Sequence, residues 1–294
     1  MRTILFEIPI PGTGRTLPVF GFGLMFVFAL LGAMQLAAWR ARRERLDPDA
    51  LLDMGFWIVL GGLLGARGLY VWQYWGTRIT SLGDVLKIWQ GGIVFYGCVL
   101  GGGAALFAYW ARTRFPFRAT IDVMAPSIAL GIALGRLGCF LNGCCYGDLC
   151  ETPHLGVRFP AHSAPWYDQL KAGQITEAAP RSLPVHPTQL YSALDGLILL
   201  GLLSAYYPLR RRDGEVMALL AVTYPITRFL IERLRNDEGA FLAGMTISQN
   251  ISLVILAMGL AFWAWLSTQP RLRYADVAPP LPTPTPRGEP ASVA

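Results

Sequence analysis

The sequence Gly135-Arg-Leu-Gly-Cys-Phe-Leu-Asn-Gly-Cys-Cys-Tyr-Gly147 overlaps the end of an apolar segment, residues 119–138. The length of this segment is within the roughly 17–25 residues that a membrane-spanning helix needs. Arg136 lies near its end, where a charged side chain costs roughly 2.5–3.5 kcal/mol on insertion scales and is functional by default. The stretch therefore predicts a membrane helix with a binding site at its end, followed by a turn rich in glycine and cysteine.

Six further segments have the length and apolar character of spanning helices. The chain is 53% hydrophobic and 15% charged, whereas soluble domains carry about 25% charged residues. We therefore predict an all-α, polytopic membrane protein with seven transmembrane helices. The predicted helices are residues 18–39, 53–75, 91–111, 119–138, 188–208, 214–232 and 247–267.

Arginine clusters follow the first, third, fifth and seventh segments, and the other connections are less basic. Because cytoplasmic loops are enriched in Lys and Arg, this alternation predicts the N-terminus outside and the C-terminus in the cytoplasm. Because the basic residues lie beside apolar segments, we attribute the net charge of +6 to membrane topology. We therefore expect the bilayer as a partner and no nucleic acid. The clusters are Arg40, Arg42, Arg43 and Arg45; Arg112, Arg114 and Arg118; Arg210, Arg211 and Arg212; and Arg271, Arg273 and Arg287.

This topology divides the chain into an arm, a membrane domain and a tail. Residues 1–17 form an extracytoplasmic arm, residues 18–267 the seven-helix membrane domain, and residues 268–294 a Pro-rich, disordered cytoplasmic tail. Residues 139–187 connect the fourth and fifth helices on the outer face. Because this connection is too long for a simple linker, we expect a small folded cap or a functional loop.

Charged side chains within the predicted helices have two interpretations. Arg67 lies midway along the second segment, and Arg228 lies four residues before Glu232 on one face of the sixth. In the first interpretation Arg228 pairs with Glu232, and Arg67 and Arg136 snorkel or pair with neighbours. In the second, the excess of buried positive charge binds an anion, because guanidinium groups suit phosphate through paired donors. A lipid headgroup phosphate is the anion most available at that depth.

Four of the five cysteines, Cys139, Cys144, Cys145 and Cys150, lie in or beside the long connection. Their spacing, Cys-x4-Cys-Cys-x4-Cys, differs from the Cys-x2–4-Cys pairs of ordinary zinc sites. It favours small packing residues in a tight turn, or disulfides, over a metal site. We therefore expect no metal and no other cofactor.

Three further features also have two interpretations each. Gly97 and the neighbouring glycines of the third segment favour close helix packing. Tyr96 is an interface aromatic or, less favoured, a hydroxyl aimed into a cavity. His186 opens the fifth helix at the membrane boundary as a structural residue or as part of a site, and we expect Thr188 to cap that helix.

Six stretches in this order resemble the motifs of the prolipoprotein diacylglyceryl transferase family, over about residues 20–240. Gly135-Arg136-x-Gly138, with Asn142-Gly143 and Gly147, resembles the signature of that family. The other stretches are Phe22-Gly23-Leu24-Met25, Trp89-Gln90-Gly91-Gly92 through Gly97, Leu155-Gly156-Val157-Arg158-Phe159-Pro160, His186-Pro187-Thr188-Gln189-Leu190-Tyr191, and Tyr224 through Arg228, Glu232 and Arg235. Several ordered motifs are far more specific than any one alone, and seven spans with the N-terminus outside are what the family has.

The resemblance implies an enzyme of the bacterial inner membrane. It moves the diacylglyceryl group of phosphatidylglycerol to the lipobox cysteine thiol of a prolipoprotein and releases glycerol 1-phosphate, with no metal. By motif position, Arg136 and Arg228 hold the phosphate. The other residues that the resemblance assigns to substrate binding are Asn142, Gly147 and Gly97, which shape the headgroup site, and Glu232 and Arg235, which orient the sixth helix.

The chain departs from the family at positions that matter for proton transfer. Tyr96 stands where the family has a histidine, which is a candidate acceptor of the thiol proton, and Cys139 and Cys144 stand where it has Asn and Glu. A free tyrosine has a pKa near 10 and is a poor base, so the alternatives to Tyr96 are His186 and the loop histidines His154 and His162. These departures leave two other functions open, a non-catalytic phospholipid-binding protein and a thiol redox membrane protein.

Overall fold

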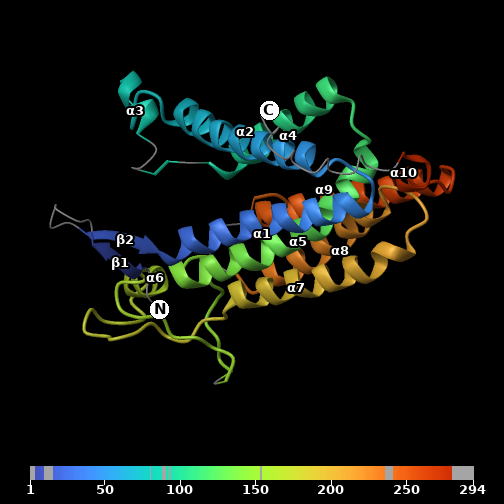
Figure 1. Cartoon of the computed structure of the whole chain (residues 1–294). Coiled ribbons are helices and arrows are strands. Elements are labelled where there is room, and N and C mark those ends of the chain that lie inside the picture. Colours follow the sequence, from blue (N-terminus) through green and yellow to red (C-terminus); the bar gives the residue numbers. More distant parts are fainter. Residues whose placement is uncertain are drawn as a thin grey trace, which may run out of the picture. The chain divides into compact units, whose positions relative to one another are not determined.

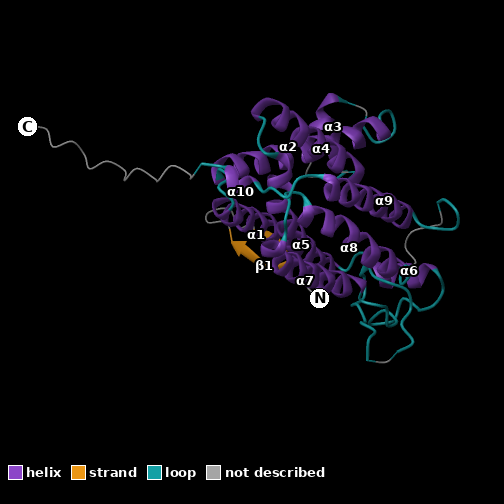
Figure 2. Ribbon diagram, turned by 90° about the vertical axis from the view of Figure 1, so that its right-hand side faces the viewer, coloured by secondary structure: helices purple, strands orange, loops and turns teal. Residues whose placement is uncertain are grey.

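The chain is mostly helical. A computed structural model describes residues 4–9, 16–79, 81–87, 91–92, 94–152, 154–235 and 241–279 (Figures 1 and 2). The elements are β1 (Ile4–Pro9), β2 (Thr16–Phe20), α1 (Gly21–Arg43), α2 (Pro48–Tyr74), α3 (Leu82–Leu86), α4 (Phe95–Thr113), α5 (Phe117–Asn142), α6 (Ala164–Lys171), α7 (Thr188–Tyr206), a 3-10 turn (Tyr207–Leu209), α8 (Glu215–Glu232), α9 (Ile247–Thr268) and α10 (Tyr274–Val277).

The long helices α1, α2, α4, α5, α7, α8 and α9 coincide with the seven predicted segments. Five of them are long and apolar enough to cross a membrane: α1, α2, α5, α7 with the turn after it, and α9. The helix α4 starts four residues later than predicted, after Gly91 and Gly92, which have φ of 84° and 80°. Two consecutive left-handed residues are incompatible with helix, so the Gly-Gly pair belongs to the connection.

The N-terminal hairpin was not expected for an all-α chain. In it β1 pairs antiparallel with β2, with Phe6 opposite Val19 and Ile8 opposite Leu17. The prolines Pro9 and Pro18 exclude a helix here, and a two-stranded hairpin tolerates them because both strands are edges. The predicted tail contains α10, and its residues 280–294 lie outside the described part of the chain.

The chain divides into two compact units, each described by itself. The first unit comprises Met1–Leu36 and Ile121–Leu272, and the second comprises Ala37–Thr120 and Arg273–Ala294. The first unit therefore holds the candidate residues of the fourth to sixth predicted helices. The second holds Arg67, Tyr96 and Gly97.

In the first unit α1, α5, α7 and α8 lie side by side (Figures 1 and 2). Small residues allow close approach: a Cβ added to Gly196 of α7 would lie 2.8 Å from the Ala133 nitrogen of α5. The start of α5 is tied to the start of α8, because the Asp122 carboxylate accepts from the Gly214 and Met217 amides at 2.7 and 2.9 Å. The two helices therefore begin at the same end of the unit.

In the second unit, glycines pack α2 against α4. A Cβ added to Gly97 would lie 2.3 Å from the Gly65 carbonyl oxygen, and one added to Gly101 would lie 2.2 Å from the Gly61 carbonyl oxygen. Both distances are far shorter than any real contact, so the two backbones touch. This is the packing of small residues that the glycine pattern favoured.

Replacing Gly97 by alanine is expected to lower the thermal unfolding temperature of the purified protein. The added methyl group forces α2 and α4 apart, and overpacking of this kind costs about 1–3 kcal/mol of unfolding free energy. Gly103→Ala on the same helix is the matched control, because its Cβ meets nothing within 4 Å. Equal melting temperatures for the two variants would contradict the close packing.

Candidate functional site

The turn after α5 is held by the start of α7. The helix α5 continues to Asn142, beyond its predicted end, and Gly143 and Cys145 then turn the chain with φ of 77° and 60°. The Thr188 hydroxyl donates to the Cys145 carbonyl at 2.8 Å, and the Gln189 amide donates to the Cys144 carbonyl at 2.7 Å. The expectation that Thr188 caps α7 was therefore wrong, since its hydroxyl fixes the neighbouring turn and Pro187 occupies the cap.

Gly147 joins this turn to two other motifs. Its amide donates to the His186 carbonyl at 2.8 Å, and the next amide, Asp148, donates to the Leu234 carbonyl at 2.8 Å. A Cβ at Gly147 would lie 2.5 Å from the Leu234 oxygen and 2.8 Å from the His186 Cβ. Position 147 therefore accommodates only glycine. Through these contacts the Gly135–Gly147, His186–Tyr191 and Tyr224–Arg235 motifs meet at one end of the first unit.

The end of α8 carries a buried carboxylate between two arginines. Glu232 is 1% exposed. Its carboxylate accepts a hydrogen bond from Arg228, and the Arg235 Nε lies 3.8 Å away. Thr246 donates to the other Glu232 oxygen at 3.4 Å, and Arg228 also donates to the Ser248 hydroxyl at 3.1 Å. The predicted Arg228–Glu232 pair is confirmed.

Arg136 and Arg67 differ sharply in their partners. The Arg67 guanidinium donates to five carbonyl oxygens of the second unit, at 2.6 to 3.4 Å, so its role is structural. The Arg136 side chain is half-buried and forms no hydrogen bond or ion pair with any residue that the structure describes. Of the two, Arg136 is the one available for an anion.

Arg136 and Arg228 lie at similar depth. Because α5 and α8 begin together and end together, each residue can be placed by helical rise from the shared end. Arg136 is about 21 Å beyond Asp122, and Arg228 is about 17 Å beyond Met217. The separation along the bundle is therefore about one helical turn.

The remaining candidates are distributed over both units. The His186 Nδ1 lies 3.3 Å from the Tyr191 hydroxyl, and its Nε2 has no partner among the described residues. Asn142 is exposed at the end of α5. Tyr96 and Gly97 lie in the second unit, where Gly97 packs against α2 and Tyr96 is 44% exposed.

Three thiols form a cluster beside the turn. The Sγ atoms of Cys139, Cys144 and Cys145 all lie within 4.8 Å of one another, and the described cysteines form no disulfide. Hydrogen bonds from the Cys139 and Cys145 thiols and from the Asn142 amide lower the pKa of Cys144. The sequence spacing did not reveal this cluster, because Cys139 is in the last turn of α5 and the left-handed Cys145 directs the chain back towards it.

The connection after the turn is a small folded cap. It contains α6, and bridges link Val157 to Val185 and Pro160 to Arg181. Phe159 and Trp166 are 0% and 2% exposed and form its core.

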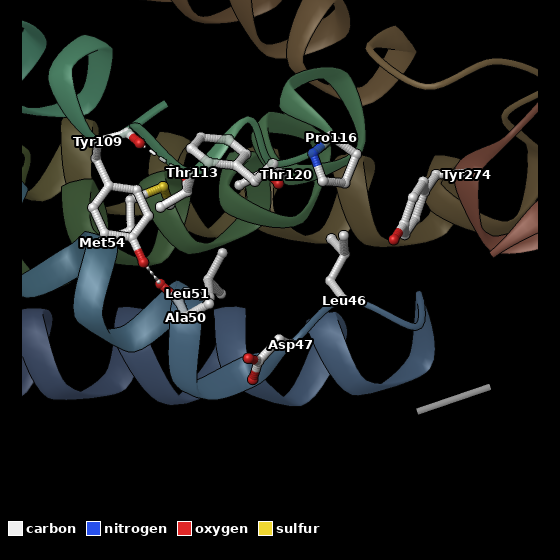
Figure 3. Close-up of a pocket in the computed structure, with 11 residues that line it drawn as sticks. Leu46, Asp47, Ala50, Leu51, Met54, Tyr109, Thr113, Pro116, Thr120 and Tyr274 are labelled. Atoms are coloured by element: carbon white, nitrogen blue, oxygen red, sulfur yellow. Dashed lines mark hydrogen bonds between the residues drawn. The ribbon is translucent and has the colours of Figure 1, made fainter. Parts of the chain in front are cut away.

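The second unit contains an apolar pocket between α2 and α4 (Figure 3). The Tyr109 hydroxyl at its wall donates to the Ala50 carbonyl at 3.0 Å, and Tyr274 lies at its edge. None of the candidate site residues lines it. The pocket therefore does not bear on the roles predicted for those residues.

Sequence reasoning missed the supporting roles of four residues. Thr188 and Gln189 hold the cysteine turn, and Thr246 and Ser248 complete the Arg228–Glu232 cluster. The position of Thr246 and Ser248 could have been predicted from the sequence, because Thr246-x-x-Gln249 is a capping box and marks the start of α9.

Comparisons with known proteins agree with the ordered motifs. The sequence model of the family described as prolipoprotein diacylglyceryl transferase matches residues 12–265. Proteins named phosphatidylglycerol–prolipoprotein diacylglyceryl transferase are similar to the chain. The one from Clostridium tetani is 30% identical over 260 residues, covering 88% of this chain and 96% of that protein. The one from Synechococcus elongatus is 33% identical over 251 residues, covering 83% and 82%.

A third relative of the same name, from Acaryochloris marina, is 32% identical over 248 residues, covering 83% of this chain and 85% of that protein. The matched length spans every motif of the first unit and the helices that carry them. The chain therefore belongs to the prolipoprotein diacylglyceryl transferase family.

Proposed function

We propose that the chain is a transferase of the bacterial inner membrane that moves the diacylglyceryl group of phosphatidylglycerol to the lipobox cysteine of a prolipoprotein. The observation that carries this proposal is Arg136, which has no partner among the described residues and lies about one helical turn along the bundle from the Arg228–Glu232 cluster, on the helix that leads into the turn where three family motifs meet. Such a group of cations suits a phosphate that gains charge as it leaves.

The reaction joins the acceptor sulfur to the glyceryl carbon. The thiol loses its proton, and the resulting thiolate forms the C–S bond. The C–O bond to phosphate breaks, and its electron pair leaves with glycerol 1-phosphate. The residues must therefore stabilise a phosphate monoester and accept one proton.

Arg136 and Arg228 hold the phosphate in this proposal. Both present paired N–H donors, which suit phosphate oxygens. Glu232 and Arg235 act on Arg228: the buried carboxylate fixes the direction of its guanidinium, while Arg235 balances the carboxylate charge. The Arg228 guanidinium is thus held in one orientation.

Asn142 and Gly147 shape the headgroup site. Asn142 is exposed at the end of α5, about 9 Å along the helix axis beyond Arg136. Gly147 allows the turn to lie directly on Leu234 and His186, which closes the site on the side of α8.

His186 accepts the thiol proton, and Tyr96 is the competing candidate. His186 is half-buried with its Cβ against Gly147, its Nε2 has no partner among the described residues, and its Nδ1 lies 3.3 Å from the Tyr191 hydroxyl.

His186→Gln is expected to lower kcat roughly 100-fold, because a general base contributes 10²–10⁴-fold and glutamine cannot accept the proton. Tyr96→Phe is expected to leave kcat unchanged within error. The transfer rate of each variant, measured from pH 6 to 9, checks this. Loss of activity in Tyr96→Phe with normal activity in His186→Gln would assign the proton to Tyr96 instead.

The proposed topology has seven spans, with the N-terminus outside and the C-terminus in the cytoplasm. The arginine clusters after alternate helices support it. The cap and the turn then lie at the outer face, where a prolipoprotein arrives, and both membrane-bound substrates enter laterally between helices. The N-terminal hairpin lies on the same side.

The test is transfer by the purified chain from phosphatidylglycerol vesicles to a lipobox peptide, followed by mass spectrometry. The expected product is a peptide with one diacylglyceryl group on its cysteine, and the same peptide with serine in place of cysteine should remain unmodified. No product, with phosphatidylglycerol still bound to the protein, would favour the non-catalytic lipid-binding alternative.

A further inference from the structure

The thiol cluster of Cys139, Cys144 and Cys145 is the group of reactive side chains that the proposed function leaves unused. Its three sulfur atoms lie within 4.8 Å of one another and are half-buried. They come from the last turn of α5 and from the turn that follows it. Cys150, the next cysteine along the chain, is buried and directs its Sγ to the Thr152 carbonyl at 3.5 Å.

The backbone that presents these thiols is held in an unusual conformation. Cys145 has φ of 60°, in the left-handed region that residues with a Cβ adopt rarely. Thr188 and Gln189 of α7 hold the two cysteine carbonyls at 2.8 and 2.7 Å. These contacts fix the backbone from which the Cys144 and Cys145 thiols project.

The separation of the sulfurs fits a metal better than packing alone. Zn–S bonds of about 2.3 Å at tetrahedral angles place sulfur atoms about 3.8 Å apart. Small rotations of three side chains bring a set within 4.8 Å to that geometry. A disulfide would use two of the thiols and leave the third without a role.

We propose that Cys139, Cys144 and Cys145 bind one zinc ion through three thiolates, and that the thiol of the acceptor cysteine takes the fourth position. The first half of this proposal stands on the sulfur geometry. The second half rests on the proposed function, because that function supplies the acceptor thiol. Thiolate ligands select zinc among the common divalent cations, and three protein ligands with one open position are typical of catalytic zinc.

The location suits this role. Arg136 precedes Cys139 by three residues on α5, so the two side chains share a helix face about 4.5 Å apart along the axis. A zinc ion with three thiolates carries one negative charge, which the neighbouring guanidinium stabilises. The acceptor sulfur would thus lie within one helical turn of the side chain that holds the phosphate.

The proton and both electron pairs are accounted for in this reaction. On binding zinc the acceptor thiol releases its proton, which passes to His186 and then to water. The sulfur keeps its electron pair and uses it to form the C–S bond, while the C–O bond breaks and its electrons leave with the phosphate. The thioether product is a weaker ligand than a thiolate and dissociates.

The test is zinc binding by the full chain in detergent under a phosphine reductant, measured by elemental analysis after dialysis against zinc. We expect about one zinc ion per chain. Cys139→Ser, Cys144→Ser and Cys145→Ser should each lower zinc affinity roughly tenfold or more, while Cys150→Ser on the same connection retains it. A wild-type chain without zinc, or equal zinc in the three variants and wild type, would overturn the site.

Cobalt substitution tests the fourth position. We expect a thiolate-to-cobalt charge-transfer band that increases when lipobox peptide is added without phosphatidylglycerol, and no increase with the serine peptide. An unchanged band with the cysteine peptide refutes the fourth-ligand role. Preferential binding of copper(I), or a disulfide between two of the three cysteines in protein purified without reductant, refutes the zinc site.

These outcomes separate the two proposals. Zinc binding is measured without lipid, so it does not depend on transfer. A wild-type chain that binds zinc but forms no thioether refutes the proposed function and leaves the zinc site. A chain that transfers at full rate with no zinc bound refutes the zinc site and leaves the proposed function.

Discussion

Arg136→Ala is expected to reduce the rate of diacylglyceryl transfer by roughly 10²–10³-fold or below detection. Removing one donor to a developing oxyanion has an effect of this size. The loss should appear in kcat, because the charge on the phosphate grows as the C–O bond breaks. Folding should be unaffected, since the Arg136 side chain has no hydrogen bond or ion pair with the described residues.

Two variants sharpen this prediction. Arg136→Lys keeps the charge but loses the paired donors, so its rate should lie between those of wild type and Arg136→Ala. Arg181→Ala is the matched control, because Arg181 is an exposed arginine of the cap. Wild-type kcat in Arg136→Ala would remove Arg136 from the phosphate site.

Arg228→Ala is expected to abolish transfer and also to destabilise the protein. Besides losing a phosphate ligand, this variant leaves the Glu232 carboxylate, 1% exposed, with Arg235 at 3.8 Å and Thr246 at 3.4 Å. Removing one partner of a buried ion pair costs about 3–5 kcal/mol, because the other charge stays buried. The melting temperature in detergent should therefore fall together with the rate.

A double variant separates the two effects of Arg228. Arg228→Ala combined with Glu232→Gln removes the buried carboxylate that has lost its hydrogen-bonded arginine, so stability should recover while transfer stays absent. Arg233→Ala is the control, since Arg233 is exposed on the same helix end and lies over the Phe229 ring. Recovery of transfer in the double variant would mean that Arg228 only balances Glu232.

Periodicity and apolar length located the helices but not the role of each intramembrane arginine. Arg67 and Arg136 look alike in the sequence, since each is an arginine within an apolar segment. Only the fold distinguishes them: the connection after α2 returns its carbonyls to Arg67, whereas no described group reaches Arg136. The i, i+4 spacing did predict the Arg228–Glu232 pair, because that contact is local.

The cysteine cluster shows why spacing fails for non-local geometry. The Cys-x4-Cys-Cys pattern is unlike a zinc motif when it is measured along an extended chain. In the structure Cys139 is helical, and two left-handed residues, Gly143 and Cys145, bring the later thiols back to it. The N-terminal hairpin was missed for a related reason, because its pairing depends on a connection that the local pattern does not specify.

In the proposed mechanism, phosphate departure and thioether formation are one reaction, held by Arg136 and Arg228. The most direct measurement quantifies diacylglyceryl peptide and glycerol 1-phosphate in the same sample, for wild type and Arg136→Ala, with vesicles of phosphatidylglycerol or phosphatidylcholine. We predict equal molar amounts of the two products from wild type with phosphatidylglycerol, at least roughly 100-fold less of both from Arg136→Ala with phosphatidylglycerol, and neither product with phosphatidylcholine. Glycerol phosphate without thioether, or equal product from Arg136→Ala, would contradict the account.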